Sequence, residues 1–73
     1  MDNLAVKFGE KLRAKRKERS ISQDDLALKS GVDRSYVGRI ERGEVNITLD
    51  KVYRLASVLE CEARDLLPIL KKS

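Results

Sequence analysis

Apolar residues recur every three or four positions along most of the chain, which is the spacing of amphipathic helices. No stretch alternates apolar and polar residues as a half-buried strand does. The predicted helices cover roughly residues 3–19, 22–30, 33–42 and 48–59, with a weaker one at 62–71. Pro68 weakens the last of these, because proline disfavours helical geometry at Leu67 and removes a hydrogen-bond donor. The pattern predicts an all-α fold.

Three of these helices begin with the same signal, a capping residue enclosed by two apolar residues. The caps are Ser22, Asp33 and Thr48, and the enclosing pairs are Ile21 with Leu26, Val32 with Val37, and Ile47 with Val52. Such a pair forms a hydrophobic staple across the first helical turn. Gly31 and Gly43 follow two of the helices, where a left-handed residue often ends a helix. Because the connection at Gly31 and Val32 is so short, helices 22–30 and 33–42 should meet steeply, as in a helix-turn-helix unit.

The helix at 33–42 has distinct inward and outward faces. At 100° per residue, Val37, Ile40 and Glu41 point inward. The outward side and its edges hold three arginines, a serine and a tyrosine, namely Arg34, Arg39, Arg42, Ser35 and Tyr36. Arginine makes the commonest specific contact with guanine, and a short helix fits the major groove. This face is typical of a DNA-reading helix, with an ordinary solvated charged face as the alternative.

Two charged residues stand where the helical pattern requires apolar ones. Leu4, Phe8 and Leu12 form a stripe on the first helix, and the next position on that stripe is Arg16. Glu41 is the one acid on the inward face of the 33–42 helix. Opposite charges on two buried faces predict an ion pair between Arg16 and Glu41. In the alternative arrangement, Arg16 extends along its aliphatic stem to solvent.

Length and composition exclude several classes of protein. With 73 residues, the chain forms one small domain, 1–73, around a single thin core. It has no histidine, which is the commonest general base and the commonest metal ligand. Its one cysteine, Cys61, can form neither an internal disulfide nor a four-thiolate zinc site. We therefore expect no enzyme activity, no metal and no cofactor.

The positive charge is concentrated near the start of the chain. The net charge is +4, and residues 7–19 hold seven basic residues against two acidic ones. This excess favours a polyanionic partner, either nucleic acid or an acidic membrane surface. A membrane-bound helix would be continuous, which the caps contradict, and no apolar run approaches the roughly 20 residues that span a membrane. Double-stranded DNA is the expected partner, with no membrane and no small-molecule ligand.

Motifs along nearly the whole chain, residues 8–67, resemble the Cro/phage-repressor-like (XRE) helix-turn-helix family. The matching segments are Ile21-Ser22-Gln23-Asp24-Asp25-Leu26-Ala27, Ser30-Gly31-Val32-Asp33-Arg34-Ser35-Tyr36-Val37 and Ile40-Glu41-Arg42-Gly43. The resemblance implies a compact five-helix, lambda-repressor-like domain whose helix-turn-helix, at about 22–42, consists of the second and third helices. Ser20 departs from the family pattern, which usually places glycine between the first two helices.

The resemblance also implies roles for individual residues. Base-reading positions match Arg34, Ser35 and Arg39. Positions at the DNA backbone match Gln23, Arg42 and Asn46. Arg16 and Glu41 match a recurring buried ion pair. The implied function is sequence-specific transcription regulation, with the protein in the cytoplasm at the nucleoid.

Within the family, the segments 33–38 and 46–49 resemble the controller proteins of restriction–modification systems. These are single-domain homodimers that activate the endonuclease gene and repress at higher occupancy. A small phage-type repressor and the antitoxin of a toxin–antitoxin pair are the alternatives. The neighbouring gene separates them, since a methyltransferase or endonuclease indicates a controller and a small toxin indicates an antitoxin.

The C-terminal segment, about 59–73, is the predicted dimerisation segment. Leu66 and Leu70 share one helical face and can pack inward, which leaves Leu67 and Ile69 for a partner surface. A twofold arrangement uses this patch on both subunits and sets two recognition helices about 34 Å apart on a pseudo-palindromic operator. In the competing arrangement, Pro68 bends the tail so that all four residues cover the monomer's own core.

Overall fold

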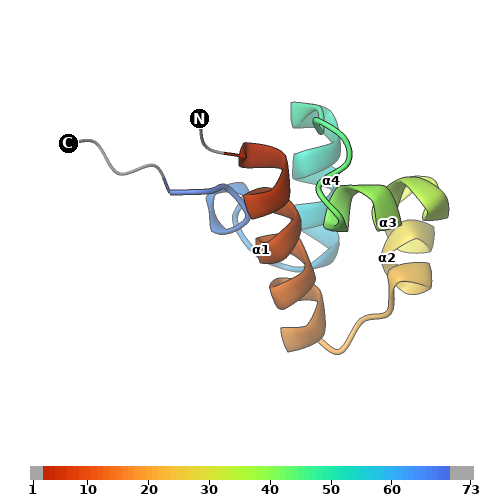
Figure 1. The fold of residues 1–73 in the computed structure, drawn as a ribbon. Coiled ribbons are helices and arrows are strands. Elements are labelled where there is room, and N and C mark those ends of the chain that lie inside the picture. The colour runs from red at the N-terminus through yellow and green to blue at the C-terminus, as the bar shows by residue number, and fades with distance from the viewer. Residues whose placement is uncertain (1–2, 70–73) are drawn as a thin grey trace.

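The computed structural model describes residues 3–69, which form four α-helices and one short 3-10 helix (Figure 1). The elements are α1 (Leu4–Glu18), α2 (Gln23–Ser30), α3 (Arg34–Glu41), α4 (Leu49–Val58) and the 3-10 helix η1 (Ala63–Asp65). No strand occurs in this part of the chain, and the prediction of an all-α fold is confirmed.

The helix starts follow the predicted caps. Ser22 Oγ accepts a hydrogen bond from the Asp25 backbone N–H at 3.0 Å, and Thr48 Oγ1 accepts one from Lys51 at 3.3 Å. Asp33 caps α3 by accepting from the backbone N–H of Ser35 at 3.2 Å. Each cap satisfies a donor that the first helical turn leaves without a partner. Local sequence signals therefore determine where α2, α3 and α4 begin.

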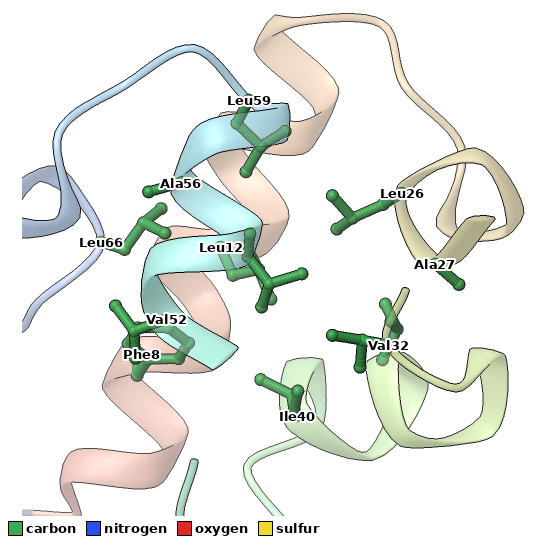
Figure 2. Packing of buried hydrophobic residues seen from close by; sticks show 12 residues of the cluster. Phe8, Leu12, Leu26, Ala27, Val32, Ile40, Val52, Ala56, Leu59 and Leu66 are labelled. Carbon is green, nitrogen blue, oxygen red and sulfur yellow. The ribbon is translucent and has the colours of Figure 1, made fainter. Parts of the chain in front are cut away.

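One hydrophobic core joins all the elements (Figure 2). Val37 and Ile40 are buried on the inward side of α3, as predicted, and Leu66 enters the same core from beyond η1. The core consists of Phe8, Leu12, Leu26, Ala27, Val32, Val37, Ile40, Val52, Leu55, Ala56, Leu59 and Leu66. Its contacts hold α3 against α1 and α2, which fixes how the outer face of α3 is presented to solvent.

Helices α1 and α3 approach each other closely at two glycines. A Cβ atom on Gly9 would lie 2.7 Å from the backbone oxygen of Glu41, closer than real Cβ contacts allow. A Cβ atom on Gly43, which ends α3 in the left-handed region at φ +75°, would lie 2.5 Å from Val6 Cγ2. Both positions require glycine, because a larger residue would push α1 and α3 apart.

The turn between α1 and α2 contains Ser20 in the left-handed conformation, with φ +57°. Its backbone N–H donates to Lys17 at 3.0 Å, and the next N–H, of Ile21, donates to Arg16 at 3.1 Å. These bonds satisfy carbonyl groups at the end of α1. The position that departs from the family pattern thus keeps the backbone geometry that glycine adopts most easily.

Two sequence-based expectations are wrong in detail. The weak helix predicted at 62–71 is the three-residue η1 in the part that the structure describes, followed by i→i−3 hydrogen bonds from Leu66 and Leu67. Pro68 lacks the N–H that a continued helix needs. Leu4, placed on the inward stripe of α1, is 48% exposed, because it lies in the first turn of the helix and borders an open apolar groove. Leu70, which was expected to pack inward, lies outside the described residues.

Figure 1 shows η1 on one side of α1, with α2 and α3 on the other. Within residues 3–69, no helix has both the length and the apolar character needed to cross a membrane.

Candidate nucleic-acid interface

The outer face of α3 carries most of the residues singled out in the sequence. Arg34, Ser35 and Arg39 are exposed on the helix, and Arg42 is exposed at its C-cap. Tyr36 is half-buried and lies under Lys51 of α4, whose Nζ is 5.4 Å from the centre of the ring. The structure therefore gathers three guanidinium groups on one side of α3, with an aromatic–cation contact at their edge.

Beneath this face lies a buried network around Glu41, whose side chain is only 4% exposed. Arg16 donates twice to the carboxylate, from Nε to Oε2 at 2.6 Å and from Nη2 to Oε1 at 3.0 Å. A third donor of Arg16, Nη1, binds the backbone oxygen of Ile21 at 3.0 Å. The guanidinium thus ties α1 to α3 and to the turn before α2, with bidentate geometry toward the acid.

The network keeps Glu41 ionised. Burial raises the pKa of this carboxyl. Hydrogen bonds from Arg16 and Gln23, together with the positive charges of Arg16 and Arg13, lower the pKa by more than burial raises it. The net effect is a pKa of Glu41 below the ordinary value for glutamic acid. The hydrogen bond with Glu41 raises the pKa of Arg16. The pair is therefore charged at neutral pH.

Gln23, at the first position of α2, belongs to the same network. Its Nε2 donates to Glu41 Oε1 at 2.9 Å, which fixes the amide beside the α3 face. An amide group has two N–H donors, so this bond leaves one for another acceptor. No sequence pattern predicts this contact, since Gln23 and Glu41 are 18 residues apart and neither spacing nor charge links them.

Two acidic residues that the sequence did not single out contact the arginines. Asp24 binds Arg34, with 2.5 Å between Oδ1 and Nε. Glu44 binds Arg42, with 2.7 Å between Oε2 and Nε, and its Oε1 lies 3.7 Å from Arg39 Nε. The hydrogen bond from Arg42 lowers the pKa of Glu44, and the same bond raises the pKa of Arg42. The net charge of this face is therefore smaller than its arginines suggest.

The remaining predicted residues lie around an apolar groove of about 250 Å³ at the first turn of α1. Leu67, 40% exposed, lines it together with Pro68, and Ile69 next to them is 77% exposed. The complete lining is Leu4, Ala5, Phe8, Val45, Asn46, Ile47, Leu67 and Pro68. Asn46, expected at the DNA backbone, thus lies at the edge of this groove in the α3–α4 loop.

Metal-ligating residues do not gather in groups of three or more anywhere in residues 3–69. Cys61 is half-buried, and burial, followed by the charge of Asp65, raises the pKa of its thiol. The arginines of the α3 face can make charge-assisted hydrogen bonds.

Comparisons with known proteins show the family and the fold of the chain. The chain matches the helix-turn-helix family model HTH_3 over residues 12–66. It is 36% identical over 67 residues to the control protein C.BamHI of Bacillus amyloliquefaciens, an alignment that covers 90% of this chain and 83% of that protein.

Solved structures include close matches to the fold. The restriction–modification controller protein C.AhdI from Aeromonas hydrophila superposes with a TM-score of 0.84 and 48% identity, covering 86% of this chain and 96% of that one. The biofilm master regulator SinR, solved in complex with DNA, superposes with a TM-score of 0.77 and 32% identity, covering 81% of this chain and 95% of that one.

Proposed function

We infer that this chain, which belongs to the helix-turn-helix family, is a DNA-binding transcription regulator and not an enzyme. We propose that it controls a restriction–modification system, because its relatives include a control protein and a restriction–modification controller protein. The observation that carries the inference is the outer face of α3, where Arg34, Arg39 and Arg42 are exposed above a packed core. Exposed arginines on a short helix suit recognition in the major groove.

In this proposal, α2 and α3 form the helix-turn-helix and α3 enters the major groove. Base edges are contacted by Arg34, Ser35 and Arg39, with Tyr36 beside them. The DNA backbone is contacted by Gln23, Arg42 and Asn46. The hydrogen bond from Gln23 to Glu41 supports its assignment, since it holds the amide at the start of α2 and leaves a donor for a phosphate.

We further propose that the protein is a homodimer and that the whole chain is one domain, with the helix-turn-helix at about 22–42 and the dimerisation segment at about 59–73. The support is the apolar groove, which Leu67 lines and which lies beside the exposed Ile69. A twofold contact through this patch would leave both α3 faces available to a pseudo-palindromic operator.

Selection of duplexes from a random pool tests the regulatory function. The expected result is a pseudo-palindromic motif whose half-sites are one helical turn, about 10 base pairs, apart. Affinity for the selected duplex should fall steeply with salt, with a slope of about −0.9 for each neutralised phosphate. Recovery of no motif, together with equal affinity for selected and random duplexes, would contradict the proposal.

Sedimentation at micromolar concentration tests the dimer. Wild type should sediment at twice the monomer mass of 8.3 kDa, and Leu67→Glu should sediment as a monomer. Leu28→Glu is the control, because Leu28 is 79% exposed on α2, away from the groove. A wild-type monomer, or a Leu67→Glu variant that remains dimeric, would contradict this interface.

A further inference from the structure

Gly38 lies in the middle of α3, where the fold gives no reason for a glycine. Its φ is not positive, and a Cβ atom there would meet no backbone atom of another helix within 4 Å. Gly9 differs, since a Cβ atom on it would collide with the backbone of α3. A glycine inside a helix destabilises it relative to alanine. The structure offers no packing gain in return for that loss at Gly38.

The atoms closest to the missing Cβ of Gly38 are the ends of two arginines. Arg42 Nη1 would be 3.2 Å from it, and Arg34 Nη1 would be 3.3 Å from it. Arg34, Gly38 and Arg42 are spaced four residues apart, so they form one stripe along the helix. Both guanidinium groups therefore reach over the bare backbone of Gly38.

Two carboxylates hold these guanidinium groups from outside. Asp24 binds Arg34 at Nε, and Glu44 binds Arg42 at Nε, with Nη2 of Arg42 also donating to Glu44 at 3.4 Å. The Nη1 groups over Gly38 are not used in these contacts. The acids thus occupy the outer edges of the two guanidinium groups, and the inner donors face the glycine.

We propose that Arg34 and Arg42 form a clamp over Gly38 that binds a single acceptor group of the DNA, and that Glu44 positions Arg42 within it. The inference rests on the proposed DNA-binding function and revises one assignment within it, since Arg34 and Arg42 then share one acceptor, on either a base or the backbone. Both Nη1 groups lie within 3.3 Å of the same point above Gly38, so one electron-rich oxygen placed there could accept a hydrogen bond from each. Both a phosphate oxygen and guanine O6 have this chemistry. Gly38 keeps the gap between the two guanidinium groups open, since any side chain there would fill it.

Gly38→Ala tests the clamp without unfolding the protein. The added methyl group meets only flexible side-chain ends, and alanine favours the helix, so the melting temperature should equal or exceed that of wild type. Affinity for the duplex that wild type selects should nevertheless fall by about tenfold or more. Equal affinity of Gly38→Ala and wild type for that duplex would overturn the clamp and leave the DNA-binding function intact.

The same titrations identify the acceptor. If the clamp holds a phosphate, Gly38→Ala weakens selected and random duplexes alike and makes the salt slope shallower by about 0.9. If it holds guanine, the variant loses preference at one base pair of each half-site and keeps the wild-type slope. Failure of wild type itself to prefer the selected duplex would instead count against the proposed function.

Glu44→Gln tests the positioning role. Removing an acid near DNA should by itself strengthen binding, so a loss of affinity in this variant indicates that Glu44 orients Arg42. Asp50→Asn is the matched control, because it also removes an exposed carboxylate from an arginine pair, the Arg54–Asp50 pair on α4. If Glu44→Gln binds the selected duplex as tightly as Asp50→Asn does, or more tightly, Glu44 has no positioning role.

Discussion

Replacing Arg16 with alanine should destabilise the protein more than any single change on the outer face of α3. The substitution removes three hydrogen bonds, two to Glu41 and one to the Ile21 carbonyl. Gln23 remains as a single neutral donor to a carboxylate that is only 4% exposed. Glu41 would then be a buried charge without a cation, and an uncompensated buried charge strongly destabilises the folded state.

The expected loss of stability is about 3–5 kcal/mol. A domain of this length has a total stability of about 4–11 kcal/mol, so the variant approaches the unfolding threshold. For a domain of this size, 1 kcal/mol corresponds to about 4–8 °C in melting temperature. Arg16→Ala should therefore melt at least about 12 °C below wild type.

Low pH should reduce the difference in stability between wild type and Arg16→Ala. In wild type the folded pKa of Glu41 is depressed, so its contribution is complete above the ordinary pKa and is lost as pH falls through the lower folded value. In Arg16→Ala, burial without the cation should raise the folded pKa of Glu41, so that protonation relieves the variant. The difference in stability between the two proteins should be widest at neutral pH and should begin to narrow as pH falls through the raised folded pKa of the variant, above the ordinary value for glutamic acid.

Thermal melts followed by circular dichroism at pH 7 and at lower pH measure both effects. Arg54→Ala is a control, because it breaks an exposed pair and should change stability by no more than about 0.5 kcal/mol. In the double variant Arg16→Met with Glu41→Leu, most of the stability should return, since neither charge remains buried. A melting temperature of Arg16→Ala within error of wild type at pH 7 would refute the reasoning.

Three further outcomes follow from positions outside the buried pair. Arg39→Ala should weaken the selected duplex by about 1–3 kcal/mol and relax preference at one position per half-site, whereas equal weakening of all duplexes would make Arg39 a backbone contact. Ser20→Gly should raise stability by up to about 1 kcal/mol in chemical denaturation, because it relieves a left-handed non-glycine residue; no gain would mean that the turn is unstrained. Cys61 should react with iodoacetamide at pH 8 more slowly in the folded protein than in urea, since burial raises its pKa, and equal rates would contradict this.

The sequence predicted best what is decided within a few neighbouring residues. Ser22, Asp33 and Thr48 cap their helices because the capping atoms lie within three residues of the donors they satisfy. The inward positions of Val37 and Ile40 follow from helical period alone. The prediction of a fifth helix at 62–71 was wrong, although the apolar spacing suits a helix. Pro68 lacks a backbone donor, and the backbone after η1 forms i→i−3 hydrogen bonds instead.

Contacts between distant residues were the least predictable. Asp24 and Arg34 are ten residues apart on different helices, and their pairing depends on the angle between α2 and α3. The bond between Gln23 and Glu41 likewise requires the fold to be known. For Leu4 the sequence predicted a buried position that the structure does not have, because a helical stripe does not reveal where the core ends. Periodicity thus assigns faces, whereas the packing angles decide which polar partners meet.

The close crossing of α1 and α3 has a consequence for how this protein can acquire new targets. Gly9 and Gly43 lock α3 onto α1 through backbone proximity and Val6, without using a side chain of the outer face. The orientation of α3 is thus set by its packing against α1, on its inner side. Residues 34, 35 and 39 can consequently be exchanged as a set while the scaffold presents each new set in the same pose. A library randomised at these positions should consist largely of folded proteins that differ in the DNA they select.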